Sequence, residues 1–190
     1  MAGASGVIGL RLVPLLVERG HDVAGMTRTP EKADSLRRVG AEPVVCNVFE
    51  SEAMCRAVHG FSPDVVVHLL TDLPDDAAQV REHASANNRM RREGTVILLE
   101  AASACGARAI AQSVAWSLPG DGGAAVEFLE RTVLAADGVV VRYGKFFGPG
   151  TYYPVTPPGP PRIHIDEAAR RTVTLLEAPS GVVDIVDDSG

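Results

Sequence analysis

The order of apolar segments along the chain restricts its fold more than any other feature. Short runs rich in β-branched residues alternate with stretches whose apolar residues recur at helical spacing. Strands are expected at 21–27, 41–48, 63–71, 107–116, 138–144 and 181–188, with helices between them. Such alternation forms βαβ units and a mainly parallel sheet. We therefore predict a single α/β domain over 1–190 with a doubly wound sheet, which binds ligands at the carboxyl ends of its strands.

Composition excludes several classes of protein. The 190 residues carry a net charge of −6, whereas general nucleic-acid binders usually have a basic surplus. The three cysteines are odd in number and lack CxxC spacing, which indicates neither a disulfide framework nor a metal site. The sequence has no apolar run of the ~18 residues that a membrane span needs, and no signal-peptide pattern. We expect a cytoplasmic protein that acts on a small molecule, without nucleic acid, membrane or metal.

A glycine-rich stretch, GASGVIG, stands at residues 3–9. Gly3 would allow a tight turn, Gly6 would let a pyrophosphate approach the backbone, and Gly9 would let the following helix pack closely. Phosphates would then meet free N–H groups at the N-terminus of that helix. The spacing alone is a weak signal, but an amphipathic helix and a strand follow in the right order. Dinucleotide binding is the prediction, and a relic of such a site is the alternative.

The residues after the strand at 21–27 bear on the choice of dinucleotide. An NAD-preferring domain usually has an acidic residue there, which binds the ribose hydroxyls. This chain has Thr27 and Arg28, with Lys32 one turn later. A guanidinium matches the oxygens of a 2′-phosphate, so NADP is predicted as the cofactor, with NAD still possible. A solvated arginine in a loop is the alternative interpretation of Arg28.

Seven segments together resemble a known family. They are GASGVIG, GMTRTPEKADSLRRVGAEPVV, PDVVVHLLTDLP, NRMRREGTVILLEAA, AQSVAW, VVVRYGKFFGPGTYY and IHIDEAARRTV. The chain is similar to NAD(P)-dependent epimerase/dehydratases and, more narrowly, to atypical extended short-chain dehydrogenase/reductases, which have a Rossmann-like fold. The resemblance implies that Ser113 polarises a substrate carbonyl and that the segment 143–153 faces nicotinamide and substrate. The cofactor-binding set that it implies is Gly3, Ser5, Gly6, Val7, Ile8, Gly9, Thr27, Arg28, Asn47, Val48, Leu70 and Thr71.

The chain departs from that family where its chemistry is done. Members usually carry a Tyr and a Lys, spaced YxxxK, on the helix after the serine strand. Here the matching stretch, GGAAVEFLERTVLAA at 122–136, has neither residue. Tyr143 is a weak substitute because it lies on a strand with Lys145, a different geometry, and ordinary packing is its alternative role. Segment 144–190 is expected to be a reduced substrate side, and most of the C-terminal lobe of the family is missing.

Other candidate residues have simpler interpretations. Asp121 and Glu127 could act as acid/base groups, although a solvated loop or helix face explains both. His68 ends a buried strand, which indicates a core histidine with satisfied hydrogen bonds more than a catalytic one. The basic residues near Arg91 fit the solvated side of a long helix expected at 77–105.

The glycine turn also lacks the strand that normally precedes it, since only Met1 and Ala2 come before Gly3. In the usual order this first strand lies at the centre of the sheet, so its loss would leave buried backbone groups unpaired. Three arrangements would repair the gap. The favoured hypothesis is a bacterial gene that starts upstream, with Met1 as an internal valine codon. Alternatively, the two flanking strands pair directly, or a second subunit supplies a strand and makes a homodimer.

These observations predict an oxidoreductase that acts at a carbonyl or hydroxyl carbon of a small metabolite, with a non-standard active site. Two other classes stay open. The chain could be a cofactor-independent cyclase or isomerase that reuses the fold, or a non-catalytic nucleotide-binding module. The missing Tyr/Lys pair favours both alternatives, whereas the glycine turn and Arg28 favour the oxidoreductase.

Overall fold

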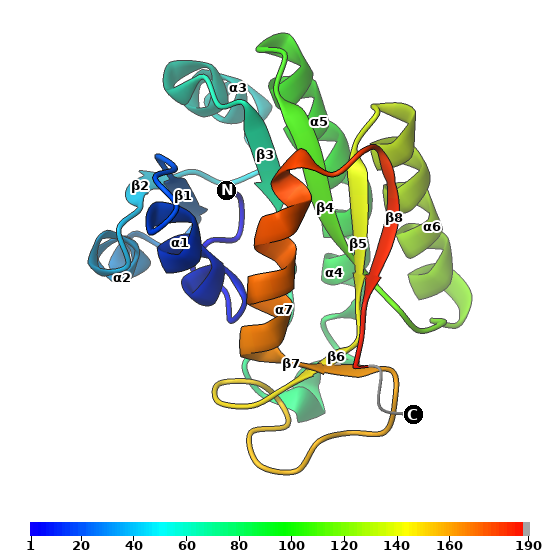
Figure 1. Cartoon of the computed structure of the whole chain (residues 1–190). Coiled ribbons are helices and arrows are strands. Elements are labelled where there is room, and N and C mark those ends of the chain that lie inside the picture. Colours follow the sequence, from blue (N-terminus) through cyan, green and yellow to red (C-terminus); the bar gives the residue numbers. More distant parts are fainter. Residues whose placement is uncertain (188–190) are drawn as a thin grey trace.

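The computed structural model describes residues 1–187 and shows a parallel sheet between two layers of helices (Figure 1). Residue 188, the predicted end of the last strand, lies outside this range. Two strands form one end of the sheet in the order β1-β2, and four form the rest in the order β3-β4-β5-β8. The bounds are β1 Ala24–Thr27, β2 Glu42–Val45, β3 Val65–His68, β4 Arg108–Val114, β5 Val139–Tyr143 and β8 Gly181–Ile185. The predicted α/β class and parallel pairing are confirmed.

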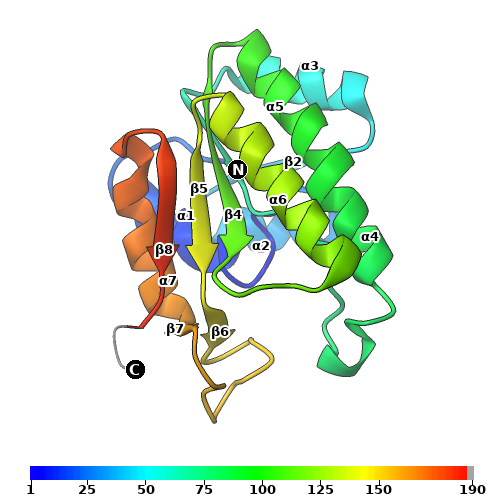
Figure 2. The same cartoon turned by 90° about the vertical axis from the view of Figure 1, so that its right-hand side faces the viewer.

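Helices cover both faces of the sheet: in Figure 2, α5 and α6 lie on the viewer's side of β4, β5 and β8, and α7 lies behind them. One layer holds α1, α2 and α7, and buried side chains of α1 and α7 share a core cluster with β3, β4 and β5. The other layer holds α3, α5 and α6. Their bounds are α1 Gly9–Val17, α2 Ala33–Arg38, α3 Ser51–Phe61, α5 Thr95–Ala104, α6 Gly120–Ala135 and α7 Ile165–Val173.

Residues 1–2 hold the place of the central strand. Ala2 forms parallel bridges to Met26 on one side and to His68 on the other. The Ala2 N–H donates to Val67 O at 2.8 Å, and the Leu69 N–H donates to Ala2 O at 2.9 Å. Direct pairing of the flanking strands, one of the three arrangements considered, therefore does not occur. Ala2 lies between β1 and β3 and carries the glycine turn to the carboxyl edge of the sheet.

The prediction of one long helix at 77–105 is wrong in part. It is divided into a 3-10 turn Ala77–Gln79, the helix α4 Ala84–Arg89, a π-turn Met90–Gly94 and α5. A π-turn adds one residue to a helical turn and so changes which positions face the core. Asn87 and Asn88 before this turn and Thr95 after it are buried, which a uniform helix with a solvated polar side does not predict.

The sequence predicts a helix at about 124–136, after a loop SLPGDGG at 117–123. In the structure this helix begins earlier, at Gly120, so the loop before it is shorter than predicted. A small parallel pair, β6 Lys145–Phe147 and β7 Arg162–His164, also escaped prediction. This pair closes the base of the loop 148–161, which has the irregular backbone expected from its proline and glycine content.

Candidate functional site

The glycine turn is built as the sequence predicted for a phosphate-binding loop. Gly3 has φ +80°, and a Cβ there would lie 2.7 Å from the Leu69 carbonyl carbon. A Cβ on Gly9 would lie 2.5 Å from Ala4 O, so the helix can start this close to the turn only with glycine. Within residues 1–187, the N–H groups of Val7 and Ile8 at the start of α1 have no backbone acceptor. They are available to an anion, as expected at a helix N-terminus.

A cleft opens beside this turn, where β1, β2 and β3 end. It has a volume of about 180 Å³. Nine of the twelve residues predicted to bind a cofactor line it, and they come from four separate segments: Gly3, Ser5, Gly6, Thr27, Arg28, Asn47, Val48, Leu70 and Thr71. Of the other three, Ile8 is buried in the core and Val7 packs against it. The topology thus brings together residues up to 68 positions apart in the chain, between Gly3 and Thr71.

Hydrogen bonds fix the floor of the cleft. The Ser5 hydroxyl donates to Thr27 Oγ1 at 3.2 Å, which joins the glycine turn to the end of β1. Thr27 is 4% exposed, and its oxygen also accepts from the Thr29 N–H at 3.2 Å. On the far side, Asn47 Oδ1 accepts from the Phe49 N–H at 3.2 Å and orders the loop after β2. The site is therefore held in shape by contacts between the loops themselves.

Two cations lie at the mouth of the cleft. Arg28 and Lys32 both line it. The Arg28 guanidinium also forms an ion pair with Asp72, with 2.7 Å between Nη2 and Oδ1. Asp72 follows β3, so this contact spans the cleft from one strand end to another. The sequence offered no signal for this pair, because it depends on the folded path of two loops.

Arg11 connects the glycine turn to the opposite side of the site. Its guanidinium donates to Val7 O at 2.8 Å, to Pro149 O at 2.5 Å and to Asp166 Oδ1 at 2.7 Å. The loop 148–161 is thereby held against the start of α1, and Tyr152 holds it a second time through a hydrogen bond to Pro74 O. Sequence reasoning missed Arg11. The available signal was a charged residue in the first turn of an otherwise apolar helix.

Ser113 lies at the end of β4 with its hydroxyl turned to α6. It donates to Glu130 Oε1 at 2.6 Å. Arg142 on β5 holds the same carboxylate through Nε at 2.8 Å and Nη2 at 2.5 Å. Burial raises the pKa of Glu130, but hydrogen bonds from Arg142 and Ser113 outweigh that effect and leave the pKa below its usual value. A hydroxyl has one proton, so the observed geometry directs the proton of Ser113 to Glu130.

The Tyr143 side chain packs into the core. The residue is 3% exposed, and its hydroxyl lies 2.6 Å from the Thr172 hydroxyl on α7. Burial raises the pKa of this phenol far above its usual value, so it is a poor proton donor or acceptor in this position. The packing role, which the sequence left open for Tyr143, agrees with this environment better than the catalytic one.

His68 has the satisfied environment that was expected of a core histidine. Its Nδ1 accepts from the Leu70 N–H at 3.2 Å, which places the ring proton on Nε2, 3.0 Å from the Thr95 hydroxyl. Burial lowers its pKa to about 4. The ring is neutral near pH 7 and serves to connect β3 to α5.

The carboxylate of Asp121, in the first turn of α6, is already occupied by hydrogen bonds to other side chains. Its carboxylate accepts from Arg92 at 2.5 Å and from the buried Asn88 amide at 2.8 Å. The hydrogen bond from Arg92 is the main cause of a lowered Asp121 pKa. Glu127 is exposed on the same helix.

Across residues 1–187, no group of three or more His, Cys, Asp or Glu side chains is arranged to hold a metal ion.

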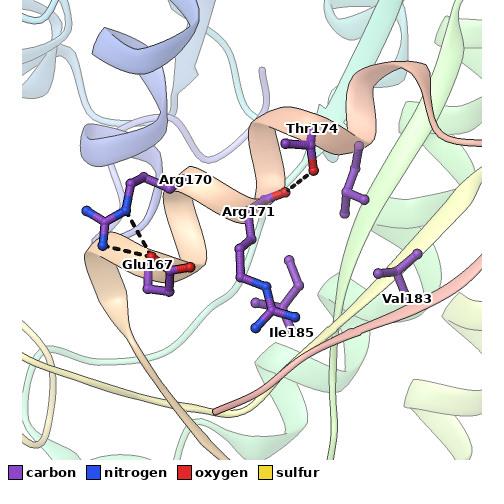
Figure 3. Close-up of a pocket in the computed structure, with 7 residues that line it drawn as sticks. Glu167, Arg170, Arg171, Thr174, Val183 and Ile185 are labelled. Carbon is purple, nitrogen blue, oxygen red and sulfur yellow. Dashed lines mark hydrogen bonds and ion pairs between the residues drawn. The ribbon is translucent and has the colours of Figure 1, made fainter. Parts of the chain in front are cut away.

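A second cavity, of about 320 Å³, lies between α7 and β8 (Figure 3). Arg170 pairs there with Glu167 at 2.8 Å, and Arg171 donates to Val186 O at 2.8 Å. The predicted cofactor residues do not line this cavity.

Within the described part of the chain, no helix has both the length and the apolar character needed to cross a membrane.

The fold and the cleft define a Rossmann-type α/β protein whose glycine turn follows Ala2, between β1 and β3. Comparison with known proteins assigns the chain to a family within this class. The model of the NAD dependent epimerase/dehydratase family matches residues 1–136. A 3-diazoavenalumate denitrifying reductase from Streptomyces is 34% identical over 232 aligned residues, which cover 99% of this chain and 75% of the reductase. The chain belongs to the NAD dependent epimerase/dehydratase family, as the sequence motifs had indicated.

Solved structures agree with this fold. The UDP-glucose 4-epimerase of Thermus thermophilus in complex with NAD superposes with a TM-score of 0.81 at 18% identity, over 100% of this chain and 77% of that one. The enzyme WbmG of Bordetella bronchiseptica in complex with NAD gives a TM-score of 0.75 at 16% identity, over 97% and 71%. This chain therefore spans about three quarters of the length of these proteins.

Proposed function

We propose that this protein is an NADP(H)-dependent oxidoreductase that acts at a carbonyl or hydroxyl carbon of a small metabolite, with NAD(H) as a weaker cofactor. The observation that carries the proposal is the convergence of nine predicted cofactor residues on one cleft beside the glycine turn. The Streptomyces relative that is 34% identical is also a reductase, one that acts on 3-diazoavenalumate.

In this proposal, the cleft and the start of α1 together contact the dinucleotide. The N–H groups at the start of α1 would bind the pyrophosphate, which the helix dipole also favours. Asn47 and Val48 would lie beside the adenine, while Leu70 and Thr71 would line the path toward the nicotinamide. When bound, the nicotinamide would supply a hydride or accept one. The role of this chain is to orient the ring and to exclude water around it.

The preference for NADP follows from charge. Arg28 and Lys32 provide two cations at the mouth of the cleft, and both would attract a 2′-phosphate. The proton donor for the substrate oxygen is not of the family type, since α6 carries neither Tyr nor Lys. Ser113 can position that oxygen only if its hydroxyl turns away from Glu130. The non-standard active site predicted from the sequence remains part of the proposal.

Binding of NADPH and NADH to the purified protein tests the proposal directly. We expect both to bind, with NADPH the tighter ligand. Replacing Arg28 by alanine should weaken NADPH about tenfold, because a guanidinium–phosphate contact contributes roughly 1.5–3 kcal/mol before solvent screening. NADH binding should change less than twofold. Arg19→Ala, a charge change at the end of α1 outside the cleft, serves as the control. Absence of binding by both cofactors at millimolar concentration would refute the proposal.

A non-catalytic nucleotide-binding module is the second candidate. The missing Tyr/Lys pair and the engagement of Ser113 by Glu130 favour it. Oxidation of bound NADPH, followed at 340 nm against a panel of small aldehydes and ketones, separates the two. Turnover with any of them supports the oxidoreductase, and tight binding without turnover across the panel supports the module.

A further inference from the structure

The ion pair across the mouth of the cleft has a consequence for cofactor choice. Arg28 is the side chain best placed to bind a 2′-phosphate, and in the structure its guanidinium is already occupied by Asp72 at 2.7 Å. The Arg28 side chain is 58% exposed and that of Asp72 is 20% exposed. The arginine can therefore turn toward a ligand in the cleft, whereas the carboxylate is the more confined partner.

The backbone around Asp72 restricts its movement. Its N–H donates at 3.0 Å to Oδ1 of Asn87, a residue that is 4% exposed on α4. Two residues further on, Pro74 O accepts a hydrogen bond from the Tyr152 hydroxyl. The loop after β3 is thus tied to a buried helix residue and to the loop 148–161. A ligand cannot readily push the carboxylate aside, so the adjustment must come from Arg28.

We propose that Asp72 is a specificity-determining residue, which competes with the 2′-phosphate of the cofactor for the Arg28 guanidinium and so narrows the preference for NADP(H) over NAD(H). The proposal rests on the proposed function, since it assumes that a dinucleotide occupies the cleft. A phosphate that binds Arg28 must displace the carboxylate and then tolerate its negative charge nearby. A ribose with a free 2′-hydroxyl makes neither demand.

The central experiment compares Asp72→Asn with Asp75→Asn. Both substitutions remove one negative charge from the same loop, but Asp75 is exposed and has no recorded ion pair within residues 1–187. We expect Asp72→Asn to tighten NADPH about three- to tenfold, the range given by an exposed ion pair together with a screened repulsion at short range. Asp75→Asn should change NADPH binding less than twofold. Neither variant should change NADH binding by more than twofold.

Two further measurements identify the mechanism. In an Arg28→Ala background, Asp72→Asn should tighten NADPH binding less than it does in the wild type. The guanidinium for which Asp72 and the 2′-phosphate compete is then absent. The fragments 2′,5′-ADP and 5′-ADP should repeat the contrast without the nicotinamide, the first responding to Asp72→Asn and the second not. Thermal unfolding of each variant checks that the fold is retained.

The outcomes separate this inference from the function on which it rests. If the wild type binds neither dinucleotide, the proposed function fails and the inference fails with it. If the wild type binds both, and Asp72→Asn changes NADPH and NADH equally or no more than Asp75→Asn does, the inference alone is overturned. A full effect of Asp72→Asn in the Arg28→Ala background would likewise overturn competition for the guanidinium.

Discussion

The contact between Glu130 and Arg142 predicts an unequal response to removal of its two partners. The Glu130 side chain is 12% exposed, whereas that of Arg142 is 39% exposed. Arg142→Met would leave a mostly buried carboxylate with the Ser113 hydroxyl as its donor. Breaking a fully buried pair costs about 3–5 kcal/mol, and the exposure of the arginine reduces this to about 2–3 kcal/mol at pH 7. Glu130→Gln should cost about 1 kcal/mol, since Arg142 can extend into water.

The response to pH distinguishes this explanation from simple loss of packing. In the wild type the Glu130 pKa is lowered, so its contribution to stability is present above the unfolded pKa and is lost as pH falls through the folded pKa. Without the arginine, burial dominates and raises that pKa. The variant then gains from protonation, and its deficit relative to the wild type should shrink between pH 7 and pH 5.

Urea unfolding followed by circular dichroism at both pH values measures these differences. Arg131→Met, an exposed change on the same helix, is the control and should stay within about 0.5 kcal/mol of the wild type. The double variant Glu130→Gln/Arg142→Met should be more stable than Arg142→Met alone, because it removes the stranded charge. The reasoning is refuted if Glu130→Gln costs as much as Arg142→Met, or if the Arg142→Met deficit is the same at pH 5 as at pH 7.

Two further predictions concern stability. Gly9→Ala should destabilise the fold by more than about 2 kcal/mol in urea unfolding, because its Cβ would meet Ala4 O at 2.5 Å. Gly60→Ala, in open space on α3, should instead stabilise the fold by about 0.5–1 kcal/mol. Equal effects of the two substitutions would contradict the close approach at Gly9. The lowered pKa of His68, about 4, means that the unfolded state binds the proton first, so stability should fall by roughly 3 kcal/mol as pH drops from 6.5 to 4. His68→Asn should reduce this dependence of stability on pH. An NMR signal of the His68 ring that titrates near pH 6.5 would disprove the prediction.

Local sequence signals predicted the strands and the glycine turn because burial and backbone geometry leave few choices there. The run from Val65 to Val67 is apolar on both faces, as a strand between two helix layers requires. The π-turn Met90–Gly94 has no comparable local signal. It is stabilised by contacts from elsewhere, including Arg89 over the Phe49 ring at 4.0 Å and the hydrogen bond between Thr95 and His68.

The candidate site divides in the same way. The sequence predicted residues that touch the cleft through their backbone or through a strand end, such as Gly3 and Thr27. It missed Asp72 and Arg11, whose importance depends on partners 44 and 155 positions away. It also misjudged the loop before α6. Gly122 and Gly123 indicated a loop, but Gly123 lies inside the helix, where a Cβ would clash with Leu118 O.

The register of Ala2 explains how distant segments form one cleft. Ala2 is paired with Met26 on β1 and with His68 on β3, so the residue after each of these three stands at the same level of the sheet. Those residues are Gly3, Thr27 and Leu69, all of which line the cleft. A shift of one position in any segment would put the positive φ of Gly3 against a different carbonyl and turn the strand-end side chains to the opposite face. The site therefore depends on a short backbone contact at the centre of the sheet as much as on the side chains that would bind the cofactor.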